Sequence, residues 1–152
     1  MSPEEQLKTL GETIPEIPAS LANYLPFKIA EKTLYISGQL PLRSGKLAIT
    51  GKLGANVTID EAKLEAKQAV LNALGIMKLA LQDLSNVSEI LKLGVFVAST
   101  PEFDSHHLVA NGASDFLVQV FGEKGKHARF AVGVSSLPLN ACVEVDVIAK
   151  IK

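Results

Sequence analysis

The chain has 152 residues, of which 47% are hydrophobic and 20% charged, so it can bury a core and lies far from disordered compositions. Its formal net charge of -1 gives no electrostatic reason to bind nucleic acid or an anionic membrane. The sequence shows no signal sequence and no apolar run long enough to span a bilayer, and its single cysteine, Cys142, is expected to be a buried reduced thiol. The chain is therefore predicted to be one cytoplasmic domain over residues 1–152.

The N-terminal 20 residues are predicted to form a short helix and an extended connector. Ser2-Pro3-Glu4-Glu5 has the pattern of a capping box with proline at the first helical position, which predicts a helix over residues 3–10. Gly11 ends this helix, and residues 14–18 carry two prolines, which favour an extended backbone.

Three short strands are predicted next. Residues 24–30 and 33–37 form a hairpin that turns at Glu31-Lys32, and residues 47–49 form a third strand between Ser44-Gly45 and Gly51. The front of the domain is therefore expected to be β-structure.

The longest predicted element is a helix from Thr58 to about Gln82. Thr58 and Glu61 form a second capping box, and an alanine-rich apolar stripe follows at helical spacing. Gly75 in its middle is tolerated at about 1 kcal/mol relative to alanine. A buried strand at residues 90–97 and a helix at residues 104–120, ended by Gly122, complete this part of the chain.

Two strands close the chain. Residues 130–134 form a short apolar run, and residues 142–151 alternate, with valines on one face and Glu144, Asp146 and Lys150 on the other. The resulting order, βββαβαββ behind a short helix, predicts an α+β fold with a mixed sheet and two main helices on one face.

Arg129 and Glu144 are the candidate catalytic pair. If the last two strands pair antiparallel around residues 135–138, both side chains come to the same end of the sheet. An arginine offers a planar fork of donors to a carboxylate, and a glutamate can deprotonate a water, so the pair suggests a site for a small acidic substrate. The alternative is that both are solvated surface charges.

Other candidate chemistry is sparse. His106 and His107 point about 100° apart on a helix, and no acidic or cysteine partner has a ligand spacing, so no metal site is assigned. The glycine pair at residues 51 and 54 lacks the context of a phosphate loop, and Ser37 lacks an adjacent histidine base.

The last two strands nevertheless carry a family pattern. Arg129, the Leu137-Pro138 turn and Val143-Glu144-Val145 resemble the C-terminal signature of the RidA (YjgF/YER057c/UK114, L-PSP) family. Residues 35–41, YISGQLP, are similar to the family's other recurring segment, and Tyr24 stands where members carry a tyrosine before the first strand.

This resemblance implies a chorismate-mutase-like fold, assembled as a homotrimer with sites between subunits. It implies that Arg129 grips a substrate carboxylate, that Glu144 positions a water, and that Tyr24, Ser37, Gly38 and Gln39 line the substrate cleft. The implied reaction is hydrolysis of 2-aminoacrylate-type enamines, or their imine tautomers, to 2-oxo acids and ammonia. It needs no cofactor.

Two segments depart from the family pattern. Many members have proline before Ala-Arg and cysteine two residues after the arginine, where this chain has His127 and Ala131. The helix carrying Asn111, Ser114 and Asp115 also differs from the common Asn-Glu-Val-Tyr pattern. Two further functions stay open: a carboxylate-binding homotrimer without catalysis, and an RNA-acting ribonuclease or translation inhibitor, for which the chain shows no basic patch.

Overall fold

The computed structural model describes residues 1–17 and 23–152. Residues 18–20 of the predicted connector therefore lie outside the described residues. In chain order the helices and strands are α1 (Pro3–Thr9), β1 (Phe27–Ala30), β2 (Thr33–Ile36), β3 (Leu42–Arg43), β4 (Lys46–Leu47), α2 (Ile59–Leu81), β5 (Val87–Ala98), α3 (His106–Phe121), β6 (Ala128–Val134) and β7 (Val143–Ile151). Short 3₁₀ helices follow α2, α3 and β6 at Leu84–Asn86, Gly122–Gly125 and Pro138–Asn140.

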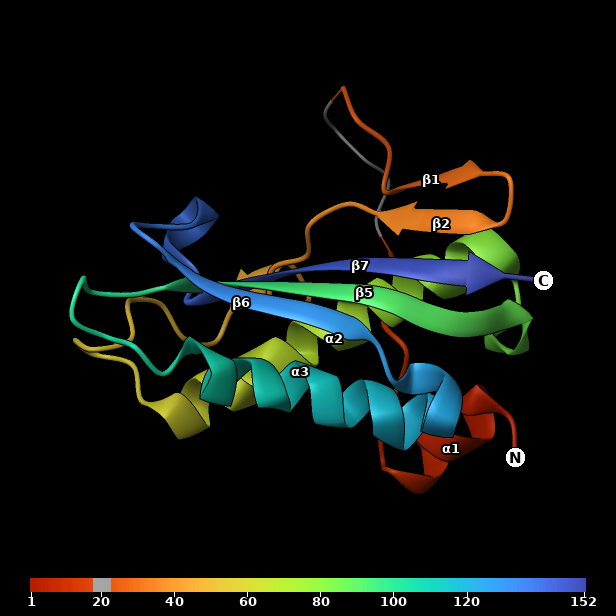
Figure 1. The fold of residues 1–152 in the computed structure, drawn as a ribbon, viewed down its shortest axis with the longest axis horizontal. Coiled ribbons are helices and arrows are strands. Elements are labelled where there is room, and N and C mark those ends of the chain that lie inside the picture. The colour runs from red at the N-terminus through yellow and green to blue at the C-terminus, as the bar shows by residue number, and fades with distance from the viewer. Residues whose placement is uncertain (18–22) are drawn as a thin grey trace.

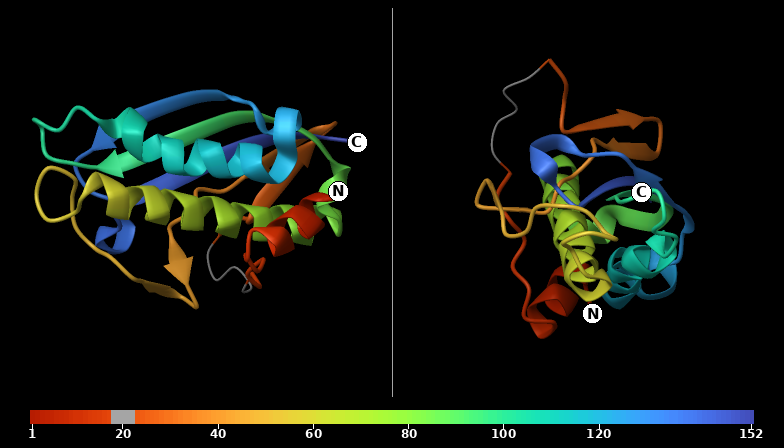
Figure 2. Two further views of the ribbon diagram at one scale, coloured as in Figure 1. Left: turned by 90° about the horizontal axis from the view of Figure 1, so that it is seen from below. Right: turned by 90° about the vertical axis from the view of Figure 1, so that its left-hand side faces the viewer.

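Five strands form one mixed sheet in the order β1-β2-β7-β5-β6. β5 is the longest strand of this sheet and lies between β7 and β6, antiparallel to β7 and parallel to β6. The helices α2 and α3 lie side by side across one face of this sheet, while the β1–β2 hairpin projects at the far edge (Figures 1 and 2). The predicted α+β architecture with two main helices on one face is therefore confirmed.

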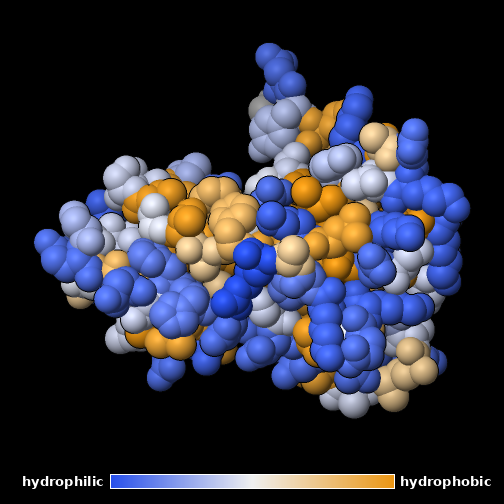
Figure 3. All heavy atoms as spheres, viewed as in Figure 1, coloured by the Kyte–Doolittle hydropathy of each residue, from blue (hydrophilic) through white to orange (hydrophobic). Residues whose placement is uncertain are grey.

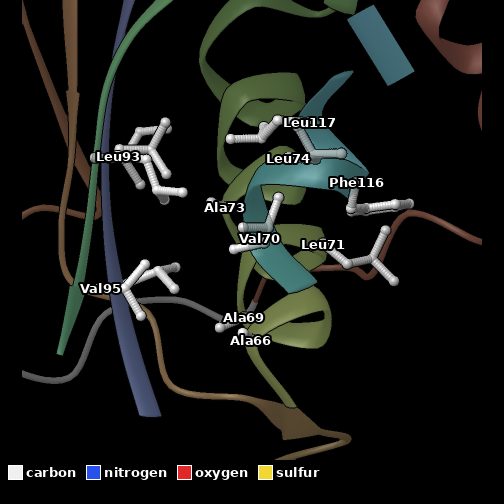
Figure 4. Close-up of a cluster of buried hydrophobic side chains, with 14 of the residues drawn as sticks. Ala66, Ala69, Val70, Leu71, Ala73, Leu74, Leu93, Val95, Phe116 and Leu117 are labelled. Carbon is white, nitrogen blue, oxygen red and sulfur yellow. The ribbon is translucent and has the colours of Figure 1, made fainter. Parts of the chain in front are cut away.

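The core lies between the helices and the sheet. Alternate residues of β5 and β7, such as Leu93, Val95 and Val145, are fully buried on the helix side. Figure 4 shows Leu93 and Val95 pointing toward Ala66, Ala69 and Ala73 of α2. These small side chains allow the helix to approach the sheet closely, as the alanine-rich stripe predicted.

The two predicted capping boxes are present. Ser2 accepts a hydrogen bond from the Glu5 amide, and Thr58 accepts one from the Glu61 amide, with both glutamates bonding back to the cap amide. The helix α2 ends at Leu81, and its C-cap Gln82 takes a left-handed conformation with φ of 66°. These local signals correctly gave the helix boundaries to within a residue or two.

Gly75 has a role that the sequence did not indicate. A Cβ at this position would lie 2.8 Å from both the Pro15 carbonyl oxygen and the Ile17 Cδ1 atom. The connector therefore packs directly against α2 at this glycine. Gly75 is a contact point between the two segments rather than a tolerated weak position in the helix.

Two predictions about strands were wrong. The third strand is a small separate hairpin, β3–β4, which turns at Ser44-Gly45 because both residues adopt positive φ angles of 51° and 77°. The strands β6 and β7 do not pair, because β5 lies between them. Among the helices of the described residues, none combines the length and apolar character needed to cross a membrane.

Candidate functional site

A groove of about 990 Å³ opens beside the β2–β7 end of the sheet. It brings together five of the six residues predicted for the site: Tyr24, Ser37, Gly38, Gln39 and Glu144. Arg129 does not line it. The groove is large enough for a small organic acid with its surrounding water.

The segment after β2 forms one wall of the groove. Gln39 pairs with Val145 of β7 through two backbone hydrogen bonds of 2.8 and 3.0 Å, so the chain continues beside β7 after β2 has ended. The Ser37 hydroxyl donates to the Leu25 carbonyl at 2.5 Å, and the Gln39 side-chain amide donates to the Ser37 carbonyl at 2.9 Å. The Ser37 oxygen therefore keeps lone pairs that can accept a hydrogen bond from a ligand.

Glu144 projects from β7 on the face opposite the helices, as the alternation along this strand predicted. Its carboxyl group occupies the space that a Cβ on Gly38 would fill, so only glycine fits there without moving the carboxyl. Burial raises the pKa of the Glu144 carboxyl above its usual value, and the charge of Asp146 raises it further. A carboxyl group with a raised pKa can exchange protons with water nearer to neutral pH.

The groove is also lined by residues that the sequence did not indicate. Asn72 of α2 is 7% exposed, and its amide nitrogen donates to the Leu40 and Leu42 carbonyls at 3.0 and 2.9 Å. It thereby ties the groove segment to the helix. Ile76 of the same helix also lines the groove. The available signal was a polar asparagine inside an otherwise apolar helical stripe, because a buried polar side chain requires such partners.

Arg129 lies on a different part of the molecule. It stands opposite Leu93 in the β5–β6 register, whereas Glu144 stands opposite Phe96 in the β5–β7 register. Roughly 10 Å across the strands and roughly 10 Å along them therefore separate the two residues. The sequence predicted both side chains at the same end of the sheet if β6 and β7 paired. Because β6 and β7 do not pair, this expectation was wrong for two residues of the same chain.

The two side chains also point to opposite faces. Glu144 is on the open face, while Arg129 points toward the helix side and contacts α3. Its Nη1 atom donates to the Asn111 side-chain oxygen at 2.9 Å and to the Ser114 hydroxyl at 3.1 Å. Arg129 is exposed on the edge strand β6, so its guanidinium group remains accessible from outside the chain.

The remaining candidates have structural surroundings. The His106 ring lies 3.1 Å from the Ser99 hydroxyl and packs edge-on against Phe103, so its surroundings in the fold account for it. Cys142 is buried as expected, and burial raises the pKa of its thiol to about 11, which makes it unreactive. Within residues 1–17 and 23–152, no cluster of three or more histidine, cysteine or acidic side chains could hold a metal ion.

Together, the mixed sheet, its two covering helices and the carboxyl-bearing groove define a small α+β protein of the chorismate-mutase-like class. The family model described as "YjgF/chorismate_mutase-like, putative endoribonuclease" matches residues 4–151. The chain belongs to this family, the RidA family that the sequence resembled.

Relatives support the same assignment. Protein TCP17 of Trypanosoma cruzi is 42% identical over 146 residues, which cover 95% of this chain and 91% of that protein. The 2-iminobutanoate/2-iminopropanoate deaminase of Capra hircus is 32% identical over 132 residues, or 87% of this chain and 82% of the goat protein. The crystal structure of a protein of unknown function from Agrobacterium tumefaciens has 49% identity and a TM-score of 0.92, covering 99% of this chain and 92% of that one.

Proposed function

We propose that this protein is a deaminase that hydrolyses reactive 2-imino acids, and their enamine tautomers, to 2-oxo acids and ammonia. The observation that carries the proposal is the Glu144 carboxyl, whose pKa is raised by burial and which lies in the groove against Gly38. The goat relative, named as a 2-iminobutanoate/2-iminopropanoate deaminase, supports the same reaction. The free, buried thiol of Cys142 fits a reducing compartment, and we propose that the protein acts in the cytoplasm. The proposed reaction uses only water and side chains of the protein, so it needs no cofactor.

The proposed site needs a second copy of the chain. Glu144 and Arg129 lie on opposite faces of one sheet, so a single copy cannot bring both to one small substrate. The open face of the sheet carries apolar side chains, including Phe96, Phe130 and the 43%-exposed Val132. Figure 3 shows apolar atoms gathered over the strands of the sheet. We propose a homotrimer in which this face is covered and Arg129 of one subunit reaches the groove of the next.

The proposed reaction begins when Arg129 of the neighbouring subunit binds the substrate carboxylate. Tyr24, Ser37 and Gln39 line the groove around the substrate's carbon chain. The substrate imine enters with a proton on its nitrogen. The Glu144 carboxylate takes a proton from a water molecule as the water oxygen adds to the imine carbon, which gives a neutral carbinolamine. The protonated Glu144 then gives this proton to the amino nitrogen, and its carboxylate takes the proton of the carbinolamine hydroxyl as the carbon–oxygen double bond forms and the carbon–nitrogen bond breaks. Ammonia leaves with the 2-oxo acid, and Glu144 releases the last proton to the ammonia or to water.

The test is the rate of 2-oxo acid release from enzymatically generated 2-aminoacrylate and bulkier imino acids. Arg129→Ala is expected to lower kcat/KM roughly 10- to 100-fold, since it removes a charged, two-point contact to the carboxylate. Lys124→Ala is the matched control, because Lys124 is an exposed cation close in sequence to Arg129 and makes no ion pair among the described residues. Equal rates for the wild type and Arg129→Ala would rule out the proposed role of this arginine.

A carboxylate-binding homotrimer without catalysis is the second candidate, because the same groove and arginine could bind a 2-oxo acid. Binding of 2-oxobutanoate without acceleration of any imine hydrolysis would favour it. The family description also names an endoribonuclease. A salt-dependent RNA titration addresses that function, and binding that weakens steeply with salt would support it.

A further inference from the structure

His127 and Arg129 contact one serine of α3 from two sides. The His127 ring nitrogen Nε2 lies 2.9 Å from the Ser114 hydroxyl oxygen, and Arg129 Nη1 lies 3.1 Å from the same oxygen. On its other side, the His127 ring nitrogen Nδ1 lies 2.6 Å from the Gly125 carbonyl oxygen. His127 and Ser114 belong to the two segments in which this chain departs from the family pattern.

The direction of each hydrogen bond follows from these partners. A carbonyl oxygen only accepts, so Nδ1 of His127 carries the proton and donates to Gly125. In the neutral ring Nε2 is then an acceptor, which takes the Ser114 hydroxyl proton. The Ser114 oxygen is left with its lone pairs toward Arg129, whose Nη1 donates to it.

The same network leaves one edge of the guanidinium free for a ligand. Nη1 uses its two hydrogens on Ser114 and Asn111. Nη2 makes only a long contact of 3.5 Å to the His107 carbonyl, and Nε makes no hydrogen bond to another group in the described part of the chain. The Nε and Nη2 hydrogens point in one direction, which is the geometry that binds a carboxylate at two points.

We propose that His127 is a positioning residue that acts through Ser114 to hold the Arg129 guanidinium ready for a substrate carboxylate. The proposal rests on the carboxylate-binding role given to Arg129 above. An exposed arginine on an edge strand samples many rotamers, and ordering it before binding removes that entropic penalty from the binding step. Without the His127 acceptor, the Ser114 proton is free to turn toward the guanidinium, and the Arg129 contact is lost.

Nuclear magnetic resonance can test this directly, because the chain has two arginines, Arg43 and Arg129. Arg43 bonds to Glu65 on another element and serves as an internal control. In His127→Leu, the Arg129 side-chain signals are expected to show faster hydrogen exchange and faster motion, while those of Arg43 stay unchanged. His127→Gln, which can retain an acceptor for Ser114, is expected to restore part of the wild-type behaviour.

Binding of 2-oxobutanoate gives the second measurement. His127→Leu is expected to raise its Kd roughly 2- to 10-fold, the effect of ordering one long side chain, with kcat for the imine little changed. Ser114→Ala is expected to raise the Kd for 2-oxobutanoate by a similar factor. The double variant with His127→Leu and Ser114→Ala is expected to raise it no further, since His127 acts through Ser114.

Unchanged Arg129 signals in His127→Leu would overturn the proposal, and so would additive effects in the double variant. Failure of the deaminase proposal has a separate sign, the absence of imine turnover by the wild type. Altered Arg129 signals together with weaker 2-oxobutanoate binding would support the positioning role whether or not turnover occurs.

Discussion

At the scale of single residues, Glu144 shows a conflict between stability and the proposed chemistry. Burial and the Asp146 charge raise the pKa of its carboxyl above the usual value near 4.5, so the folded chain disfavours the ionised form. At neutral pH the ionised group therefore lowers the free energy of unfolding. At a pH below the pKa of this carboxyl in the unfolded chain, the group is protonated in both the folded and the unfolded chain, and it no longer lowers the free energy of unfolding.

Glu144→Gln is therefore expected to raise the melting temperature at pH 7 and to leave it unchanged near pH 4. The same variant is expected to lower imine turnover roughly 10²- to 10⁴-fold, since it removes the acid/base group. Thermal unfolding at the two pH values, together with the turnover assay, measures both effects.

Asp146→Asn is the matched control for Glu144→Gln. It makes the same neutral replacement on the same strand and face, and burial also raises the pKa of this carboxyl. It is expected to stabilise the protein at pH 7 but to retain turnover. A lower melting temperature for Glu144→Gln at pH 7 would instead mean that the folded protein stabilises the Glu144 carboxylate.

The sequence predicted which residues of the Ser37–Gln39 segment line the groove, but it did not predict the side-chain contacts made by Asn72 and Arg129. The segment of Ser37, Gly38 and Gln39 lies beside Glu144, because the backbone pairing of Gln39 with Val145 aligns two family motifs. Asn72 was missed because its role depends on carbonyl groups 30 and 32 residues away in the sequence. The contacts of Arg129 with Asn111 and Ser114 were also missed, since no local pattern joins β6 to α3.

At the scale of elements, the close contact between α2 and α3 depends on Gly112. A Cβ on this residue would overlap the backbone carbonyl of Lys63 in α2. Alanine favours a helix over glycine by about 1 kcal/mol, but a backbone clash cannot be relieved by turning a side chain. The two helices would have to separate, and α3 carries the Asn111 and Ser114 side chains that contact Arg129.

Gly112→Ala is expected to lower the free energy of unfolding by roughly 1–3 kcal/mol, the usual effect of overpacking. Chemical denaturation measures it. Gln119→Ala, on the exposed side of the same helix, is the control and is expected to change stability by less than about 0.5 kcal/mol. If Gly112→Ala raises the free energy of unfolding instead, the close contact between α2 and α3 at Gly112 does not contribute to stability.

Helix boundaries were predictable because caps are local, whereas strand neighbours were not. Thr58 with Glu61 marks the start of α2 from four consecutive residues. The last two strands suggested a pair because a short turn joins them, yet β5 inserts between them and pairs with both. A parallel β5–β6 pair joined through α3 lets this helix pack against both strands and buries most of the helix-facing side chains of β5, and this long-range gain prevails over sequence proximity.

At the scale of the whole molecule, the open face of the sheet determines how a complete site is proposed to form. The helices cover one face, and Glu144 projects from the other among apolar side chains such as Phe96. Arg129 is on the edge strand and cannot reach the groove of its own chain. If the site lies between subunits, each chain supplies Arg129 to one site and Glu144 to another.

Mixed trimers test this division of labour. Arg129→Ala and Glu144→Gln subunits are each expected to be nearly inactive alone. When they are refolded together in equal amounts, every trimer containing both kinds has one site with an intact arginine and an intact glutamate. Random mixing then restores about a quarter of the wild-type activity per subunit.

The control mixes each variant with itself under the same refolding conditions, and light scattering confirms that all samples have the mass of a trimer. Recovery should rise with the fraction of mixed trimers and should be lost when the subunits are mixed without unfolding and do not exchange. If samples shown to contain mixed trimers recover no imine turnover, Arg129 and Glu144 must act from the same chain. Because Arg129 and Glu144 point to opposite faces of the same sheet, that result would also require at least one of them to act outside the groove.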